Sequence, residues 1–100
     1  MAKNFNLSIY KQYYDQIKDG TKKIEYRKIA DYYTKKFIVD GIAPGEGRLK
    51  AKHYDTVTFY HQGDPPMVVK WEGLFLYPRK NPQWYAIKLG EIISPKQSGK

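Results

Sequence analysis

The sequence predicts an α+β fold that is mainly β: a small, partly open β-barrel of five or six strands with one or two short helices. Short runs rich in β-branched and aromatic residues recur along the chain, which is typical of strands. The later runs are joined by connections too short for the helical crossovers of parallel sheets. With 100 residues, of which 41% are hydrophobic, the chain is large enough for one core but not for two. We therefore expect a single domain over residues 1–93 and a flexible basic tail over residues 94–100.

The N-terminal part predicts a strand, a helix and a turn. Residues 5–9 alternate apolar and polar side chains, as a strand with one buried face does. Residues 10–19 have helical periodicity, because four side chains recur at i, i+3, i+4 and i+7 and are expected in the core: Tyr10, Tyr13, Tyr14 and Ile17. Gly20 follows and is expected to end the helix, since glycine adopts the left-handed conformation at low steric cost.

A charged strand follows this turn. From Lys23 the side chains alternate, with Lys23, Glu25 and Arg27 on one face and Ile24 and Tyr26 on the other. This alternation predicts that Ile24 and Tyr26 face the core. The charged row is then either a solvent-exposed edge, which is common for edge strands, or the floor of a pocket.

The rest of the chain predicts, in order, a second short helix, a glycine-rich loop and three strands: residues 29–37, 40–47, 56–60, 67–76 and 84–89. Gly73 interrupts the second of these strands and indicates a bulge or a corner of the barrel. In the last strand, Tyr85, Ile87 and Leu89 are expected to face inward.

The composition disfavours several classes of function. The chain has no cysteine, which excludes disulfides, thiolate nucleophiles and cysteine-based zinc sites. Its two histidines, His53 and His61, have no carboxylate at metal-ligand spacing on a helix, so we expect neither a metal nor another cofactor. No apolar run approaches about 18 residues, and the N-terminus lacks the apolar region of a secretory signal. We therefore expect a cytoplasmic protein without a membrane partner.

The charge balance favours an anionic partner. The chain has 18 Lys and Arg residues against 10 Asp and Glu residues, which gives a net charge of +8. Such an excess attracts nucleic acids and nucleotides, although it also suits an acidic protein. The sequence identifies no particular protein partner.

One short motif resembles a known family. Gly20, Lys22, Glu25 and Arg27 form the pattern G-x-K-x-x-E-x-R after an aromatic-rich helix. This pattern, together with the order of the later strands, resembles the ASCH domain, a family of the PUA-like superfamily of β-barrels. The resemblance implies a PUA-like barrel whose cleft holds RNA, a nucleotide or a modified nucleoside. It places the binding residues at Gly20, Lys22, Lys23, Glu25 and Arg27.

Three functions stay open at this point. The first is an RNA- or nucleotide-binding domain, in which Lys22 and Arg27 contact a phosphate or a base carbonyl and Glu25 either holds Arg27 or accepts a hydrogen bond from a base amine. The second is a small nucleoside- or RNA-processing hydrolase, either a ribonuclease or an enzyme like the family branch that hydrolyses N4-acetylcytidine. Lys22 and Glu25 would then be catalytic, although that branch has threonine where this chain has Glu25. The third is a basic protein-interaction domain.

Overall fold

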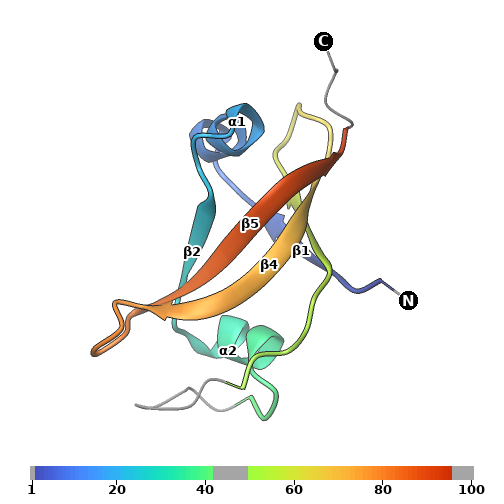
Figure 1. Ribbon diagram of the computed structural model, residues 1–100. Coiled ribbons are helices and arrows are strands. Elements are labelled where there is room, and N and C mark those ends of the chain that lie inside the picture. Colours follow the sequence, from blue (N-terminus) through green and yellow to red (C-terminus); the bar gives the residue numbers. More distant parts are fainter. Residues whose placement is uncertain (1, 42–49, 96–100) are drawn as a thin grey trace.

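The computed structural model describes residues 2–41 and 50–95, and within them a mixed five-stranded sheet curls into a half-barrel with two helices (Figure 1). The elements in chain order are β1 (Asn4–Ser8), α1 (Lys11–Asp19), β2 (Ile24–Lys28), α2 (Asp31–Phe37), β3 (Thr56–Tyr60), β4 (Met67–Tyr77) and β5 (Trp84–Ser94). This arrangement confirms the predicted fold class. Residues 42–47 of the predicted loop, and residues 96–100 of the predicted tail, lie outside the described residues, whereas Ser94 still belongs to β5.

The order of strands leaves two open edges. The sheet runs β1-β3-β4-β5-β2, with β1 and β3 parallel and the other neighbours antiparallel. Strands β1 and β2 are therefore its edges, and curling brings them towards each other. A hydrogen bond of 2.9 Å from Arg27 of β2 to the Ser8 carbonyl of β1 links the two edges. We call this gap between β1 and β2 the seam.

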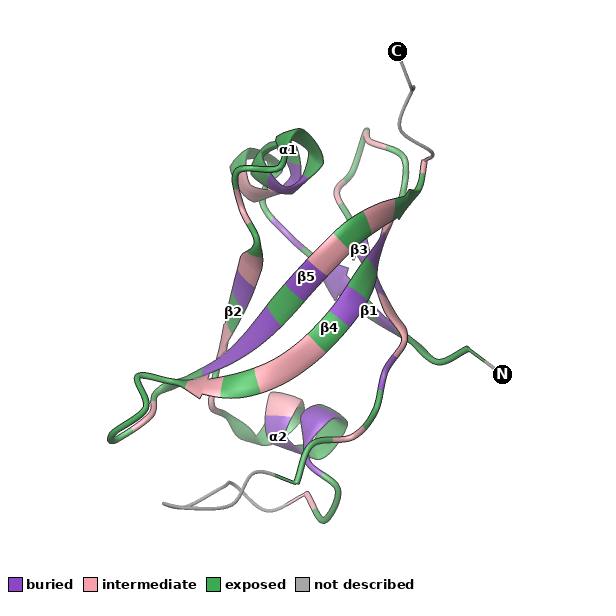
Figure 2. Ribbon diagram, viewed as in Figure 1, coloured by how far each residue is buried: buried purple, intermediate pink, exposed green. Residues whose placement is uncertain are grey.

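The core lies on the concave side of the sheet. Tyr85, Ile87 and Leu89 of β5 are buried there, as the alternation in the sequence predicts. Buried segments along β5 are visible in Figure 2. Gly73 lies where the register of β4 against β5 shifts, which confirms the predicted irregularity. Helix α2 adds the fully buried Phe37, whose ring centroid lies 5.4 Å from that of Tyr85. The helices lie near opposite ends of the half-barrel (Figure 1).

Helix α1 buries a narrower stripe than its periodicity predicts. Tyr14 and Ile17 are buried, and Tyr13 is half-buried. The prediction that Tyr10 lies in the core is wrong, because Tyr10 precedes the helix and is 76% exposed. The residue at an N-cap position is still extended, so its side chain does not follow the helical stripe. Neither described helix is long and apolar enough to cross a membrane.

A charged cluster fastens the β3–β4 connection to α1. Lys11 Nζ lies 3.0 and 3.1 Å from the two carboxylate oxygens of Asp64, and His61 Nδ1 lies 3.1 Å from Asp64 Oδ2. The hydrogen bond from Lys11 holds the pKa of Asp64 below its usual value, and the hydrogen bond from His61 acts in the same direction. Tyr14 adds a hydrogen bond to the carbonyl of Pro65.

This cluster predicts an acid-sensitive contribution to stability. Because the pKa of Asp64 is lower in the folded chain, its contribution is complete above the unfolded value of about 3.9 and is lost as the pH falls through the folded value. The Asp64→Asn variant should therefore lose stability less steeply than the wild type when the pH drops below about 4. Urea unfolding at a series of pH values measures the two slopes. Equal slopes in this range would contradict the assigned role of Asp64.

Candidate functional site

The turn after α1 fixes where the motif begins. Gly20 has φ of 88°, which is the left-handed conformation predicted for this position. Its N–H donates to the carbonyl of Ile17, and the N–H groups of Thr21 and Lys22 both donate to the carbonyl of Gln16. Asp19 accepts hydrogen bonds from the side chain and the backbone of Thr21, and these lower the pKa of Asp19. The backbone that carries Lys22 is thus held on both sides of the turn.

Three of the predicted site residues meet in one ionic group. Glu25 is only 4% exposed. Its Oε2 accepts a hydrogen bond of 2.9 Å from Arg27 Nε and lies 2.8 Å from Arg27 Nη2. Its Oε1 lies 3.4 Å from Lys22 Nζ. A buried carboxylate is costly unless it is paired, and here a cation lies at each of its oxygens.

Arg27 is engaged within the protein. Besides its contact with Glu25, Nη1 donates a 2.9 Å hydrogen bond to the Tyr33 hydroxyl, and Nη2 donates one of the same length to the Ser8 carbonyl. All three guanidinium nitrogens therefore have a partner in the chain. Arg27 ties β2 to β1 and α2, and it fixes the direction of the Glu25 carboxylate.

Lys22 is held more loosely than Arg27. An ammonium group carries three N–H donors. Within the described residues, its oxygen contact is with Glu25 at 3.4 Å, longer than a typical charge-assisted hydrogen bond of about 2.7–2.9 Å. Lys22 Nζ also lies 4.8 Å from the ring centroid of Tyr13 and 5.7 Å from that of Tyr26. Its side chain is 16% exposed, so a ligand can reach a cation that is positioned by two rings.

The remaining two predicted residues lie apart from this group. Lys23 is exposed, and with Gly20 and Lys22 it borders a further hollow of about 430 Å³ between the end of α1 and β5, near Gly90. Lys23 precedes Ile24, the first residue of β2, and so lies at the entrance to the strand. The structure brings together Lys22, Glu25 and Arg27 and leaves Lys23 outside.

The prediction for the other face of β2 is wrong. Tyr26 is 38% exposed and Ile24 is only half-buried, whereas Glu25 is buried. The face with Glu25 and Arg27 points towards the seam, where Ser8 and Tyr33 supply polar partners. Glu25 and Arg27 of the charged row therefore line a hollow rather than a solvent-exposed edge, whereas Lys23 is exposed.

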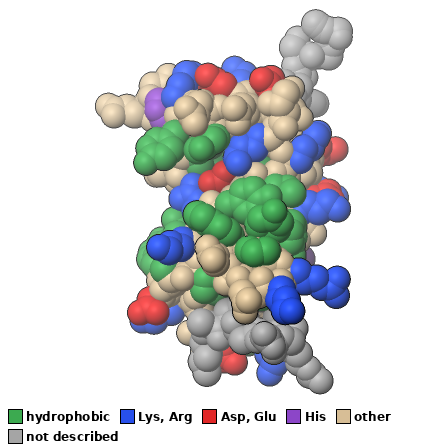
Figure 3. Space-filling model, turned by 90° about the vertical axis from the view of Figure 1, so that its left-hand side faces the viewer, with side chains coloured by type: hydrophobic (Ala, Val, Ile, Leu, Met, Phe, Trp, Pro, Cys, Tyr) green, Lys and Arg blue, Asp and Glu red, His purple; other side chains and the backbone are tan. Residues whose placement is uncertain are grey.

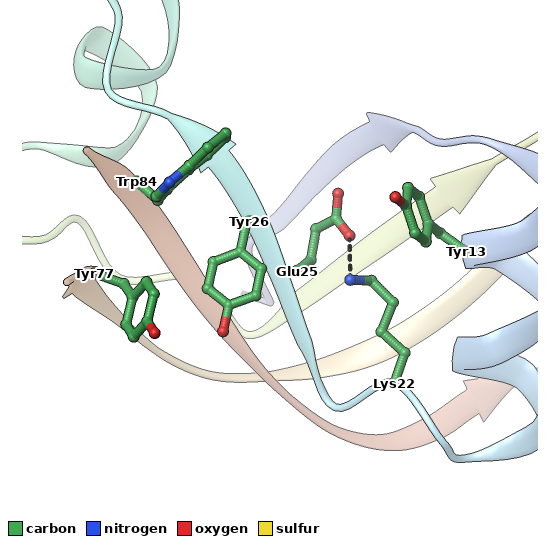
Figure 4. Close-up of a pocket in the computed structure, with 6 residues that line it drawn as sticks. All are labelled: Tyr13, Lys22, Glu25, Tyr26, Tyr77 and Trp84. Atoms are coloured by element: carbon green, nitrogen blue, oxygen red, sulfur yellow. Dashed lines mark ion pairs between the residues drawn. The ribbon is translucent and has the colours of Figure 1, made fainter. Parts of the chain in front are cut away.

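Two adjoining hollows border the ionic group of Lys22, Glu25 and Arg27. The first, which we call the aromatic pocket, has a volume of about 400 Å³ and is lined by Tyr13, Lys22, Glu25, Tyr26, Tyr77 and Trp84 (Figure 4). The second, the seam groove, has about 410 Å³ and is lined by Ser8, Ile9, Tyr10, Tyr13, Glu25, Tyr26 and Arg27. The face of the molecule that contains β2 shows hydrophobic side chains in groups, with Lys and Arg side chains around them (Figure 3).

The aromatic walls include residues that the sequence did not single out as site residues. Tyr26 and Tyr77 have ring centroids 5.6 Å apart. Trp84 lies beside them because it is paired in register with Tyr77, and it is 39% exposed. The motif itself contained one usable signal. If Glu25 and Arg27 line a pocket, the alternation of the strand places Tyr26 on the opposite, outer face. There Tyr26 lies beside the side chains of the neighbouring strands.

The described residues contain no group of three His, Cys, Asp or Glu side chains that could hold a metal ion. His53 pairs with Asp55 at 3.0 Å, and His61 pairs with Asp64, both away from the aromatic pocket. What the pocket offers instead is a cation, a carboxylate and ring faces. Such a set offers contacts for both the face and the hydrogen-bonding edge of a flat ligand.

No protein-family model, no curated protein and no solved structure matches this chain, so membership of the ASCH family stays a prediction.

Proposed function

We propose that this chain is an RNA- or nucleotide-binding domain that takes one base into the aromatic pocket. The observation that carries the proposal is the joint presence of a Lys22–Glu25 pair and exposed aromatic rings around one hollow of about 400 Å³. Neither feature alone would favour a base. Together they match the two surfaces of a base, its face and its edge.

The rings suit the face of a base. Unpaired bases stack on aromatic side chains, and each such contact contributes about 1–3 kcal/mol. Tyr13 and Tyr26 lie on the two sides of Lys22, at 4.8 and 5.7 Å from its ammonium group. A base that stacks on either ring has its edge next to Lys22 and Glu25.

The polar pair suits the edge of a base. Each carboxylate oxygen can accept two hydrogen bonds. Oε2 of Glu25 is occupied by Arg27, whereas Oε1 is approached only by Lys22, at 3.4 Å, among the described residues. Oε1 can therefore accept an N–H of the base while Lys22 donates to a neighbouring ring nitrogen or carbonyl. In this proposal Arg27 positions Glu25 rather than contacting the ligand.

The overall charge suits a phosphate-bearing ligand. The net charge is +8, and Lys23 and Lys28 are exposed at either end of β2. Phosphate contacts by lysine make binding weaken as salt is added. A free nucleoside would show little of this dependence.

A nuclear magnetic resonance titration with the four nucleoside 5′-monophosphates tests this function. We expect saturable shifts of the backbone amides of residues 22–27 and of the Trp84 indole N–H. Inorganic phosphate is the control, and it should not shift the Trp84 signal. Saturable shifts confined to the hollow near Gly90, or no shifts with any nucleotide or short RNA, would overturn the proposal.

A further inference from the structure

We infer that the aromatic pocket continues over the outer face of β2, β5 and β4 as a stacking surface for further bases, so that the ligand is a single strand of RNA several nucleotides long rather than a free nucleotide. This inference rests on the proposed function for its first base. It follows from a set of rings that the register of the three strands brings together outside the core.

The register places four aromatic side chains around one alanine. On β5, Ala86 pairs with Tyr26 of β2 on one side and with Phe75 of β4 on the other. Trp84, two residues earlier on the same face, pairs with Tyr77 of β4. We call Tyr26, Phe75, Tyr77 and Trp84 the outer aromatic patch.

The rings of this patch are accessible although they cover the strand beneath. Ala86 is 0% exposed, even though it lies on the face opposite the core residues Tyr85 and Ile87. The four aromatic residues themselves are 37 to 50% exposed. Single exposed aromatic residues are ordinary, but four in one register block form a contiguous apolar surface of the kind that marks a binding site.

The patch is continuous with the aromatic pocket. Tyr26, Tyr77 and Trp84 belong to both, and in Figure 4 Tyr26 lies between Tyr77 and the Lys22–Glu25 pair. Phe75 belongs to the patch but is not among the residues that line the aromatic pocket or the seam groove. A strand whose first base fills the pocket can therefore place its next bases on the outer rings.

The charges around the patch are those that a phosphate backbone needs. Lys28 lies in register with Trp84, and Lys88 lies in register with Ile24 and Gly73. Arg79 and Lys80 are exposed in the connection after Tyr77. On the outer face, Lys88, Ala86 and Trp84 of β5 and the residues paired with them on β2 and β4 include two lysines and no acidic residue. Rings between cations are the arrangement that binds single strands with little sequence preference.

The test compares an unstructured, mixed-sequence heptaribonucleotide with the four nucleoside monophosphates, using the full chain and titration calorimetry. The wild type should bind the heptanucleotide at least about 10-fold more tightly than any monophosphate, since each added stacked base strengthens binding. Phe75→Leu should weaken heptanucleotide binding by about 5- to 10-fold and leave monophosphate binding unchanged. Lys88→Ala should reduce the slope of log affinity against log salt by about 0.7.

The matched control is Tyr32→Leu, because Tyr32 is an exposed aromatic residue on α2, 59% exposed and outside both hollows. It should bind the heptanucleotide as the wild type does. Equal heptanucleotide affinity of Phe75→Leu and the wild type, with monophosphate binding intact, would overturn this inference and leave the proposed function standing. If Phe75→Leu weakens heptanucleotide binding and Lys22→Met does not, the outer aromatic patch would be retained as a binding surface and the proposed pocket would be overturned. If neither the heptanucleotide nor any monophosphate binds, this inference and the proposed function are both overturned.

Discussion

Replacing Arg27 with alanine is expected to lower the free energy of unfolding by about 3 kcal/mol, because it removes the main partner of a buried carboxylate. Glu25 would keep only Lys22, at 3.4 Å, while the Ser8 carbonyl and the Tyr33 hydroxyl would each lose a donor. Leaving one member of a buried ion pair unpaired costs more than the pair itself contributes. Urea unfolding at neutral pH measures the difference.

Two variants serve as controls for this result. Lys28→Ala removes the neighbouring exposed cation of β2 and should change the free energy of unfolding by less than about 0.5 kcal/mol. Arg27→Lys keeps a charge but loses the planar set of donors, so it should lie between alanine and the wild type. A loss of under about 1 kcal/mol in Arg27→Ala would show that Glu25 does not depend on Arg27 in solution.

Replacing Lys22 with methionine is expected to weaken nucleotide binding by about 10- to 100-fold, which corresponds to the loss of one hydrogen bond from a charged donor. Methionine keeps an unbranched apolar side chain and removes the ammonium group that lies near the rings of Tyr13 and Tyr26. Glu25 keeps its contacts with Arg27, so the loss of stability should be smaller than in Arg27→Ala. Titration calorimetry with the tightest-binding monophosphate measures the effect.

Lys23→Met is the matched control, since Lys23 is adjacent in sequence, has the same charge and, unlike Lys22, does not line the aromatic pocket. Its affinity should stay within about twofold of the wild type apart from a shallower salt dependence. Equal losses in the two variants would indicate a diffuse attraction to positive charge instead of a defined contact at Lys22.

The local part of this structure could be predicted from the sequence. The left-handed turn at Gly20 depends on that residue itself, because only glycine adopts this backbone conformation at low steric cost. The strand after it follows from the alternation of its own side chains. The inward side of β5 followed from its alternation in the same way.

The face of β2 could not be predicted by the same reasoning. A period of two divides the residues of a strand into two sets but does not say which set is inside. The usual preference for apolar residues favoured Tyr26, whereas Arg27 finds its partners in Ser8 and Tyr33, 19 residues before it and 6 after it. Such tertiary partners outweighed the preference and turned Glu25 inward.

The aromatic pocket is also a product of tertiary structure. Tyr13, Tyr26, Tyr77 and Trp84 come from four different elements. They meet because β2 pairs with β5, and β5 with β4, in a register that the sequence does not specify. The motif therefore indicated the floor of the site, and the walls appeared only with the sheet.

A crystal structure of the chain with a short unstructured ribonucleotide would show whether the aromatic pocket takes a base. We expect a base stacked on Tyr13 or Tyr26, with its edge hydrogen-bonded to Glu25 Oε1 and to Lys22 Nζ. Ribonucleotide bound elsewhere on the protein, with no base in the aromatic pocket, would contradict it.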